Sequence, residues 1–93
     1  MTYRLLYTEM FEQSLQSLDR QDAVRIVEKM TWLAENAEEI QHERLTNPPR
    51  GLEGVCKRRV GSQRIIYWVD HEAKEIVGYD VLWRRGKYRD LYW

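Results

Sequence analysis

An apolar periodicity in residues 21–36 constrains the fold more than any other feature of this chain. Apolar side chains recur there at the spacing of one helix face: Ala23, Ile26, Val27, Met30, Leu33, Ala34 and Ala37. This i, i+3, i+4, i+7 spacing predicts an amphipathic helix of about four turns. A helix with one apolar stripe packs that stripe against another element, so the rest of the chain must supply a second layer.

A shorter helix is predicted just upstream, over roughly residues 9–18. Phe11, Leu15 and Leu18 recur at i, i+4 and i+7, which places them on one face. Thr8 offers an N-cap, and two glutamates follow in the first turn, where the helix dipole favours negative charge. Because a short connection separates the two helices, we expect them to form an antiparallel hairpin.

Segments rich in β-branched and aromatic residues predict four strands, at residues 3–7, 55–60, 63–70 and 75–83. Residues 38–54 contain two prolines and two glycines, which predict a long irregular connection. The order β-α-α-β-β-β defines a single domain over residues 1–93. We predict an α+β fold, with an antiparallel sheet and the helical hairpin packed on one of its faces.

Alternation along the second and third strands predicts which side chains face the helices. Side chains of successive strand residues point to opposite faces, so one face takes a set of apolar residues: Cys56, Val60, Ile65, Tyr67 and Val69. Lys57, Arg59 and Arg64 then face away from the helices together, and Arg58 lies at the edge. The sequence therefore predicts an open basic face on the sheet.

The charge distribution agrees with a basic face, although the chain is neutral overall. Residues 1–50 carry six Lys/Arg against nine Asp/Glu, and residues 51–93 carry nine against six. A neutral chain with one basic face is typical of a phosphate-binding surface. The alternative is that these cations only keep exposed strand ends soluble.

Cysteine content and hydropathy bound the cellular location. The single cysteine, Cys56, cannot form an intrachain disulfide, which fits a reducing compartment. No window approaches the length of apolar sequence that crosses a membrane. We expect a soluble cytoplasmic protein with no membrane partner.

The segment "GVCKRRVGSQRIIY" (54–67) resembles the strand–turn–strand motif of the RelE/ParE superfamily of toxins. Upstream, "WLAENAEEIQHERL" (32–45) is similar to the end of the family's second helix and its following loop. Downstream, "RDLY" (89–92) is similar to the family's C-terminal motif. The resemblance implies a RelE/ParE-like, microbial-RNase-like fold and the toxin of a bacterial toxin–antitoxin pair. The RelE branch is implied to cleave mRNA in the ribosomal A site, and the ParE branch to poison DNA gyrase.

The resemblance also implies site residues and partners. The implied catalytic residues are Lys57, Arg59, Arg64, Arg85 and Tyr92. A second set is implied to bind substrate: Glu43, Arg84, Lys87, Tyr88 and Arg89. One residue is inserted before Tyr92 relative to some members, so Tyr88 is the alternative to Tyr92, and Arg84 the alternative to Arg85. The implied partners are an acidic, RelB-like antitoxin, the ribosome and mRNA; no cofactor is implied.

The RNA cleavage that the resemblance implies would use the 2′-OH of the RNA itself and would need no metal. One cysteine and two scattered histidines, His42 and His71, do not make a closed metal site, and we expect both histidines to be exposed. Lys57 can act as base among clustered cations. Arg64 can clamp the phosphate, and Arg85 can serve as acid or charge stabiliser.

Structural alternatives stay open for several of these residues. Arg64 can pair with Asp80 or Glu53, and Lys57 and Arg59 can protect an edge strand from aggregation. Trp68 and Trp83 can stack on bases, or pack in the core or at its rim. Two rival functions also stay open: a ParE-like gyrase inhibitor without RNase activity, and a binding protein without catalysis.

Overall fold

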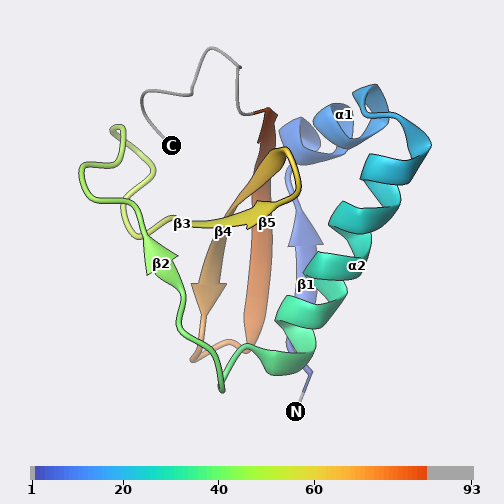
Figure 1. Cartoon of the computed structure of the whole chain (residues 1–93). Coiled ribbons are helices and arrows are strands. Elements are labelled where there is room, and N and C mark those ends of the chain that lie inside the picture. Colours follow the sequence, from blue (N-terminus) through green and yellow to red (C-terminus); the bar gives the residue numbers. More distant parts are fainter. Residues whose placement is uncertain (1, 84–93) are drawn as a thin grey trace.

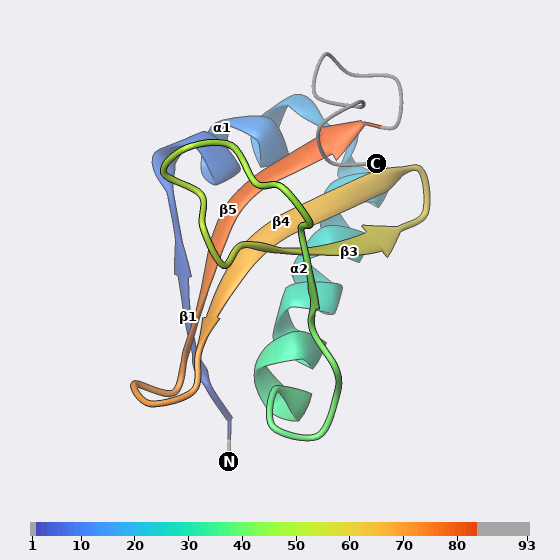
Figure 2. The ribbon, with the colours of Figure 1, turned by 90° about the vertical axis from the view of Figure 1, so that its left-hand side faces the viewer.

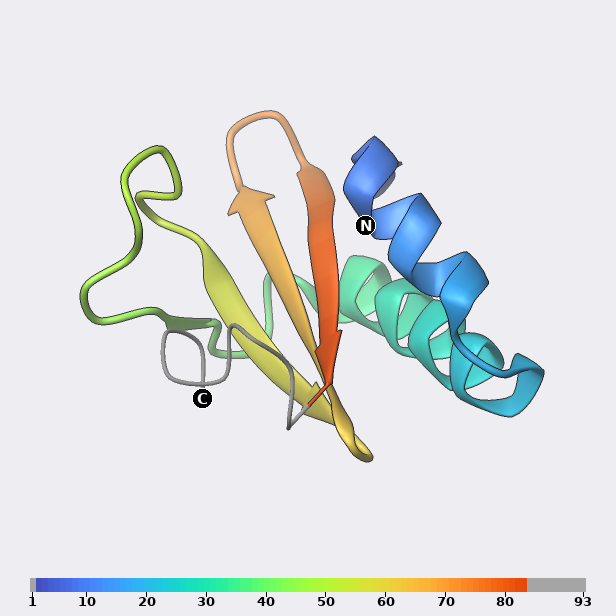
Figure 3. The same ribbon diagram turned by 90° about the horizontal axis from the view of Figure 1, so that it is seen from above.

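The computed structural model describes residues 2–83, which form two layers. The elements follow the order β1 (Arg4–Tyr7), α1 (Glu9–Ser17), α2 (Arg20–Asn36), β2 (Glu43–Arg44), β3 (Cys56–Val60), β4 (Gln63–Asp70) and β5 (Glu75–Trp83). The strands form one five-stranded sheet in the order β1-β5-β4-β3-β2. Both helices lie on one side of this sheet (Figures 1 and 3). The predicted α+β fold, with helices on one face, is confirmed.

Side-chain caps set the start of both helices. Thr8 Oγ1 accepts a hydrogen bond from the Phe11 amide at 3.1 Å and donates one to the Tyr79 carbonyl at 2.6 Å. Asp19 Oδ1 accepts from the Asp22 amide at 3.0 Å, which caps α2. Thr8 therefore ties the start of α1 to β5. The short connection between the helices, at Leu18 and Asp19, sends α2 back across the sheet.

The buried stripe of α2 is narrower than the sequence predicts. Ile26, Met30, Leu33 and Ala34 are buried against the sheet, but Val27 is 44% exposed. Val27 follows Ile26 by about 100° around the helix, which moves its side chain to the margin of the stripe. The prediction that Val27 faces the core is wrong because the contact with the sheet covers only the centre of the stripe.

The sheet is mostly antiparallel, with one parallel pair at its edge. β3, β4 and β5 form the predicted antiparallel meander. β1 instead pairs in parallel with β5, with Leu5 opposite Ile76. The helical hairpin permits this pairing, because it returns the chain across the sheet before the meander begins.

The segment predicted as irregular contains a further strand. β2 has only two residues and pairs with β3, with Glu43 opposite Lys57 and Arg44 opposite Cys56. Composition did not predict it, because so short a strand owes its pairing to the neighbouring strand. The prediction of a fully irregular segment over 38–54 is wrong at this point.

Two apolar clusters cover opposite faces of the sheet. The main core contains Cys56, Val60, Ile65 and Tyr67 beneath the helices, with Val69 packed against it, as predicted. A smaller cluster on the other face is formed by Leu52, Val55, Ile66 and Leu82, with Leu45, Trp68 and Tyr79. Figure 2 shows the segment between α2 and β3 crossing this second face. The face that was predicted to be open is therefore partly covered.

Candidate functional site

Four of the predicted site residues lie together on the face of the sheet that points away from the helices, on three neighbouring strands. β2, β3 and β4 place Glu43 opposite Lys57, and Arg59 opposite Arg64. The neighbours of these residues on the strands, including Cys56, Val60 and Ile65, belong to the helix-side core. The predicted orientation of Lys57, Arg59 and Arg64 follows from this alternation.

Glu43 and Lys57 form an ion pair at the edge of the sheet. Lys57 Nζ lies 3.6 Å from Glu43 Oε2, and the Lys57 side chain is 17% exposed whereas that of Glu43 is 70% exposed. The pair therefore joins a lysine whose side chain is largely covered to a glutamate whose side chain is open to solvent. An exposed carboxylate can meet a substrate, and Lys57 restrains its position.

Two arginines face each other on neighbouring strands of the same site. Arg59 is exposed, and its Nε donates to the Gly61 carbonyl at 3.3 Å. Arg64 is partly buried, and this burial lowers the pKa of its guanidinium. Glu43 opposes that decrease in pKa and Arg59 adds to it. Arginine cations opposite each other repel, so the pair creates a local field that favours an anion.

The carboxylates proposed as alternative partners of Arg64 have interactions of their own. Asp80 accepts hydrogen bonds from Ser14 Oγ at 2.6 Å and from the Val81 amide at 2.8 Å. Glu53 Oε1 accepts from the Gly51 amide at 3.3 Å. The carboxylate whose charge raises the pKa of Arg64 is Glu43.

His42 is not exposed, contrary to the prediction. It is partly buried, with Nδ1 2.8 Å from the Tyr67 hydroxyl and Nε2 2.9 Å from the Ala37 carbonyl oxygen. Burial is the main cause of its lowered pKa, and the charges of Arg58 and His71 add to that decrease. Since the carbonyl can only accept, Nε2 carries the proton and Nδ1 accepts from Tyr67 in the neutral ring. No sequence signal marked this contact, because Tyr67 lies in a distant strand.

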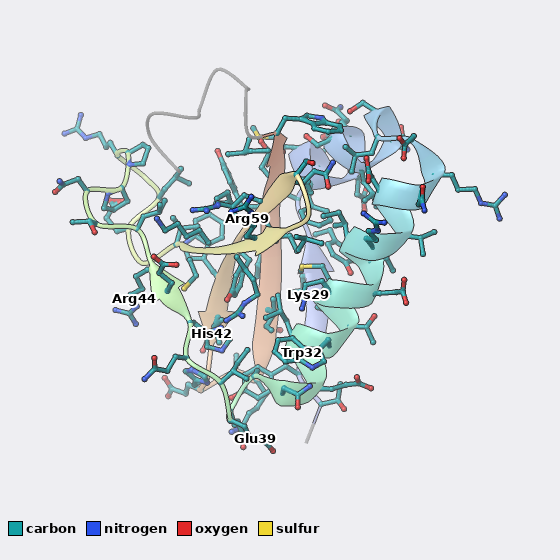
Figure 4. The ribbon with its side chains drawn as sticks, in the orientation of Figure 1. Lys29, Trp32, Glu39, His42, Arg44 and Arg59 are labelled. Carbon is teal, nitrogen blue, oxygen red and sulfur yellow. The ribbon has the colours of Figure 1, made fainter. Side chains whose placement is uncertain are left out.

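The other polar and aromatic side chains resolve differently. His71 is exposed, as predicted, with Nδ1 2.7 Å from the Tyr3 hydroxyl. Trp32 lies on α2 with Lys29 Nζ 4.5 Å from its ring centroid and Arg58 Cζ at 5.7 Å. Figure 4 shows Trp32 and Lys29 on α2 and His42 on the segment that leads to β2. Trp68 packs edge-on against Tyr79, so it serves the second apolar cluster.

The remaining predicted site residues lie outside the described part of the chain. They are Arg84, Arg85, Lys87, Tyr88, Arg89 and Tyr92. Within residues 2–83, no group of three or more His, Cys, Asp or Glu side chains could hold a metal ion. No helix in this part of the chain is long and apolar enough to span a bilayer.

The fold and the site define a class: a two-layer α+β domain with a basic sheet face, from which a carboxylate projects. No protein-family model and no curated protein matches the sequence. Solved structures do match. The chain is similar to a RelBE toxin–antitoxin complex of Mycobacterium tuberculosis, with a TM-score of 0.72 and 23% identity over 90% of this chain and 100% of that one.

Two further structures show the same architecture. A RelE–RelB complex of the archaeon Pyrococcus horikoshii matches with a TM-score of 0.71 and 24% identity, over 91% of this chain and 98% of that one. A chromosomal ParDE toxin–antitoxin system of P. aeruginosa matches with a TM-score of 0.60 and 18% identity, over 88% and 96%. The chain therefore has the fold shared by RelE-type and ParE-type proteins.

Proposed function

We propose that this chain is a RelE-like toxin that cleaves mRNA in the ribosomal A site and is neutralised by a cognate antitoxin. The likeness to RelE proteins solved in complex with RelB supports the toxin and its partner. Fold alone does not determine activity, so the support for an RNase comes from the site. The proposed location is the cytoplasm, because translation of mRNA takes place there.

One observation carries the RNase proposal: Arg59 and Arg64 lie opposite each other, and the Glu43–Lys57 pair lies on the same face. Two guanidinium groups offer planar donor pairs that match phosphate oxygens. Arg64 is partly buried, so less water competes with a phosphate for its guanidinium group. The attraction between the guanidinium and the phosphate is therefore stronger than it would be in open solvent. This arrangement favours a phosphodiester that carries extra negative charge in its transition state.

The chemistry needs no metal. The 2′-oxygen of the RNA attacks phosphorus, the bond to the 5′-oxygen breaks, and a 2′,3′-cyclic phosphate and a 5′-hydroxyl form. Glu43 replaces Lys57 as the proposed base and takes the 2′ proton, because a carboxylate accepts a proton directly whereas a lysine ammonium must first lose one. Lys57 holds Glu43 and adds positive charge. Arg59 and Arg64 stabilise the phosphorane, and Arg85 or Tyr92 is the proposed donor to the 5′-oxygen.

Programmed ribosomes test this proposal directly. Purified protein is incubated with ribosomes on a defined mRNA, and cleavage ends are mapped by primer extension beside a naked-RNA control. We expect a cut within the A-site codon, and Arg64→Ala should slow it by about 100-fold. Arg44→Ala is the matched control, because Arg44 lies on the same sheet edge but alternates to the other face. Intact mRNA on the ribosome would overturn the proposal.

The likeness to a ParDE system supports a second candidate, an inhibitor of DNA gyrase. Such an inhibitor needs no catalytic cations, so Arg64→Ala would leave its effect unchanged if the protein folds. A supercoiling assay with purified gyrase separates the two functions. Loss of supercoiling with intact mRNA would favour this second candidate.

The proposed antitoxin contributes acidic side chains. An Asp- and Glu-rich segment can lie across Lys57, Arg59 and Arg64, or along the helical hairpin. The first placement would block the site directly. A synthetic acidic peptide that protects mRNA from cleavage in high and low salt alike would oppose this electrostatic assignment, since such binding weakens in salt.

A further inference from the structure

We infer that His42 is a positioning residue that holds Glu43 in place against Lys57. This inference rests on the proposed function, because Glu43 is the proposed base. His42 directly precedes Glu43 in the chain, and its ring bridges the end of α2 and the middle of β4. The ring thus fixes the backbone at the point where β2 begins.

The contacts of His42 connect three parts of the fold. Nε2 donates to the Ala37 carbonyl at 2.9 Å, and Nδ1 lies 2.8 Å from the hydroxyl of Tyr67. The Tyr67 side chain is completely buried, so its hydroxyl is a fixed point in the core. In Figure 4, His42 lies on the segment that leads from α2 to β2.

Alternation places Glu43 on the other side of this anchor. His42 reaches into the helix side of the sheet, where Tyr67 belongs to the main core. Glu43 is the next residue, and it pairs in register with Lys57, which faces away from the helices. Because successive strand residues point to opposite faces, the hydrogen-bonded His42 ring on the helix side directs the Glu43 carboxylate to the other face.

β2 needs such an anchor because it is only two residues long. So short an edge strand gains little from its own pairing. Its flanks are held by a hydrogen bond from Arg58 Nη2 to the Gln41 carbonyl at 2.7 Å, and by one from the Leu45 amide to the Val55 carbonyl at 3.0 Å. The His42 bonds lie between these two and fix the start of the strand itself.

The groups around His42 keep its ring neutral. Burial is the largest cause of the lowered pKa of His42, and the charges of Arg58 on β3 and His71 in the β4–β5 turn lower it further, against the opposing effect of the Ala37 carbonyl. The His71 ring centroid lies 5.9 Å from that of His42. Tyr67 on β4 and the Ala37 carbonyl at the end of α2 provide one donor and one acceptor, which suit the neutral ring. The anchor therefore persists at neutral pH.

The test uses two variants that cut the anchor in different ways. His42→Ala removes the ring, and Tyr67→Phe removes only the hydroxyl oxygen and keeps the buried ring. We expect each to slow mRNA cleavage about tenfold in kcat with little change in KM, as for the loss of one buried hydrogen bond. The double variant should be no slower than the slower single variant, because both remove the same link.

A second readout does not depend on cleavage. Hydrogen exchange of the Leu45 amide reports how well β2 is held, since that amide donates to Val55. We expect exchange about tenfold faster in both variants than in the wild type. His71→Ala is the matched control, because it removes the other histidine of the cluster and leaves both hydrogen bonds of His42 in place. It should change neither readout more than about twofold.

The action through Glu43 is tested in a Glu43→Gln background. There, His42→Ala should cause no further loss of cleavage, whereas a general loss of fold would lower activity in both backgrounds. Wild-type exchange at Leu45 in both variants, or a full further loss in the Glu43→Gln background, would overturn the inference. If the wild type does not cleave mRNA at all, the proposed function fails, and the exchange data still decide whether His42 anchors β2.

Discussion

The two faces of the β3–β4 hairpin differ in how they are built, although they share the same strands. The helix-side face carries Cys56, Val60, Ile65 and Tyr67, all buried in the main core. The opposite face carries Lys57, Arg59 and Arg64, with Ile66 in a smaller cluster. Adjacent residues on one strand therefore serve stability on one side and the proposed chemistry on the other.

The two faces also differ in what completes them. The helix-side face is closed by regular elements, α1 and α2, whose apolar stripes fit the sheet. The opposite face is completed by β2 and the segment that follows it, which contribute Glu43, Leu45 and Leu52. Regular helices make a robust core, whereas the site depends on a two-residue strand and its anchors.

The largest expected effect comes from the helix-side face. Ile65→Ala removes a side chain that is completely buried beneath the helices. The lost burial and the cavity should lower the free energy of unfolding by about 2–5 kcal/mol, measured by chemical denaturation. Arg64→Ala, one residue away on the opposite face, should cost much less in stability. Equal losses for the two variants would break the distinction between the faces.

The next effect concerns the close approach of α1 to β5. A Cβ at Gly78 would lie 2.9 Å from Phe11 ring carbons, and Phe11 is itself buried. Gly78→Ala should therefore lower the free energy of unfolding by about 1–3 kcal/mol. Phe11→Leu should reduce the cost of the added methyl group in the double variant. A double-mutant cycle in urea with strictly additive effects would contradict this packing argument.

On the basic face, a substitution of Arg64 that keeps the positive charge and changes only the geometry should have a smaller effect, on the rate of cleavage. Arg64→Lys retains a cation but loses the planar donor pair, so the phosphate contact weakens. We expect mRNA cleavage on the ribosome to slow by about tenfold, with an unchanged denaturation midpoint. Arg59→Lys is the paired comparison, since Arg59 is exposed and should be more tolerant. Full activity of Arg64→Lys would mean that Arg64 acts only through its charge.

The sequence predicted the regular elements closely because each carries its own local signal. The predicted third and fourth strands end where β4 and β5 end, and Thr8 caps α1 as expected. The alternation of Cys56 and Lys57 placed the two faces correctly, because a strand has only two sides. Strand ends, helix caps and the alternation of faces depend on residues that are close together in the sequence, so the sequence alone predicts them.

The remainder of the site depends on contacts between distant segments. Glu43 was assigned by resemblance, but its strand and its register opposite Lys57 come from β3. His42 was expected in solvent because nothing near it in the chain shows that Tyr67 lies within reach. The parallel pairing of β1 with β5 is a further long-range choice. Short elements of this kind are specified by tertiary contacts and not by propensity.

Asp80 does not follow the division of side chains between the two faces of the sheet. Its substitution should change the free energy of unfolding less than the two substitutions at buried positions do. Asp80 pairs in register with Ile66, yet its carboxylate accepts a hydrogen bond from Ser14 on α1. An irregularity in the ladder between Ile66 and Tyr67 accompanies this change of side. Asp80 therefore belongs to the helix side although its position in the register belongs to the basic face.

Burial raises the pKa of Asp80, while the bonds from Ser14 and the Val81 amide oppose that rise. A carboxyl group with a raised pKa binds its proton more tightly in the folded state, so it favours folding at low pH. That contribution is lost as the pH rises from the unfolded pKa through the folded pKa. Asp80→Asn keeps an acceptor oxygen without the charge, so from acidic to neutral pH the wild type should lose stability relative to this variant, by less than about 1 kcal/mol. Denaturation curves for both proteins at a series of pH values measure the difference. A gap that stays constant with pH would show that the Asp80 carboxyl titrates alike in the folded and unfolded states.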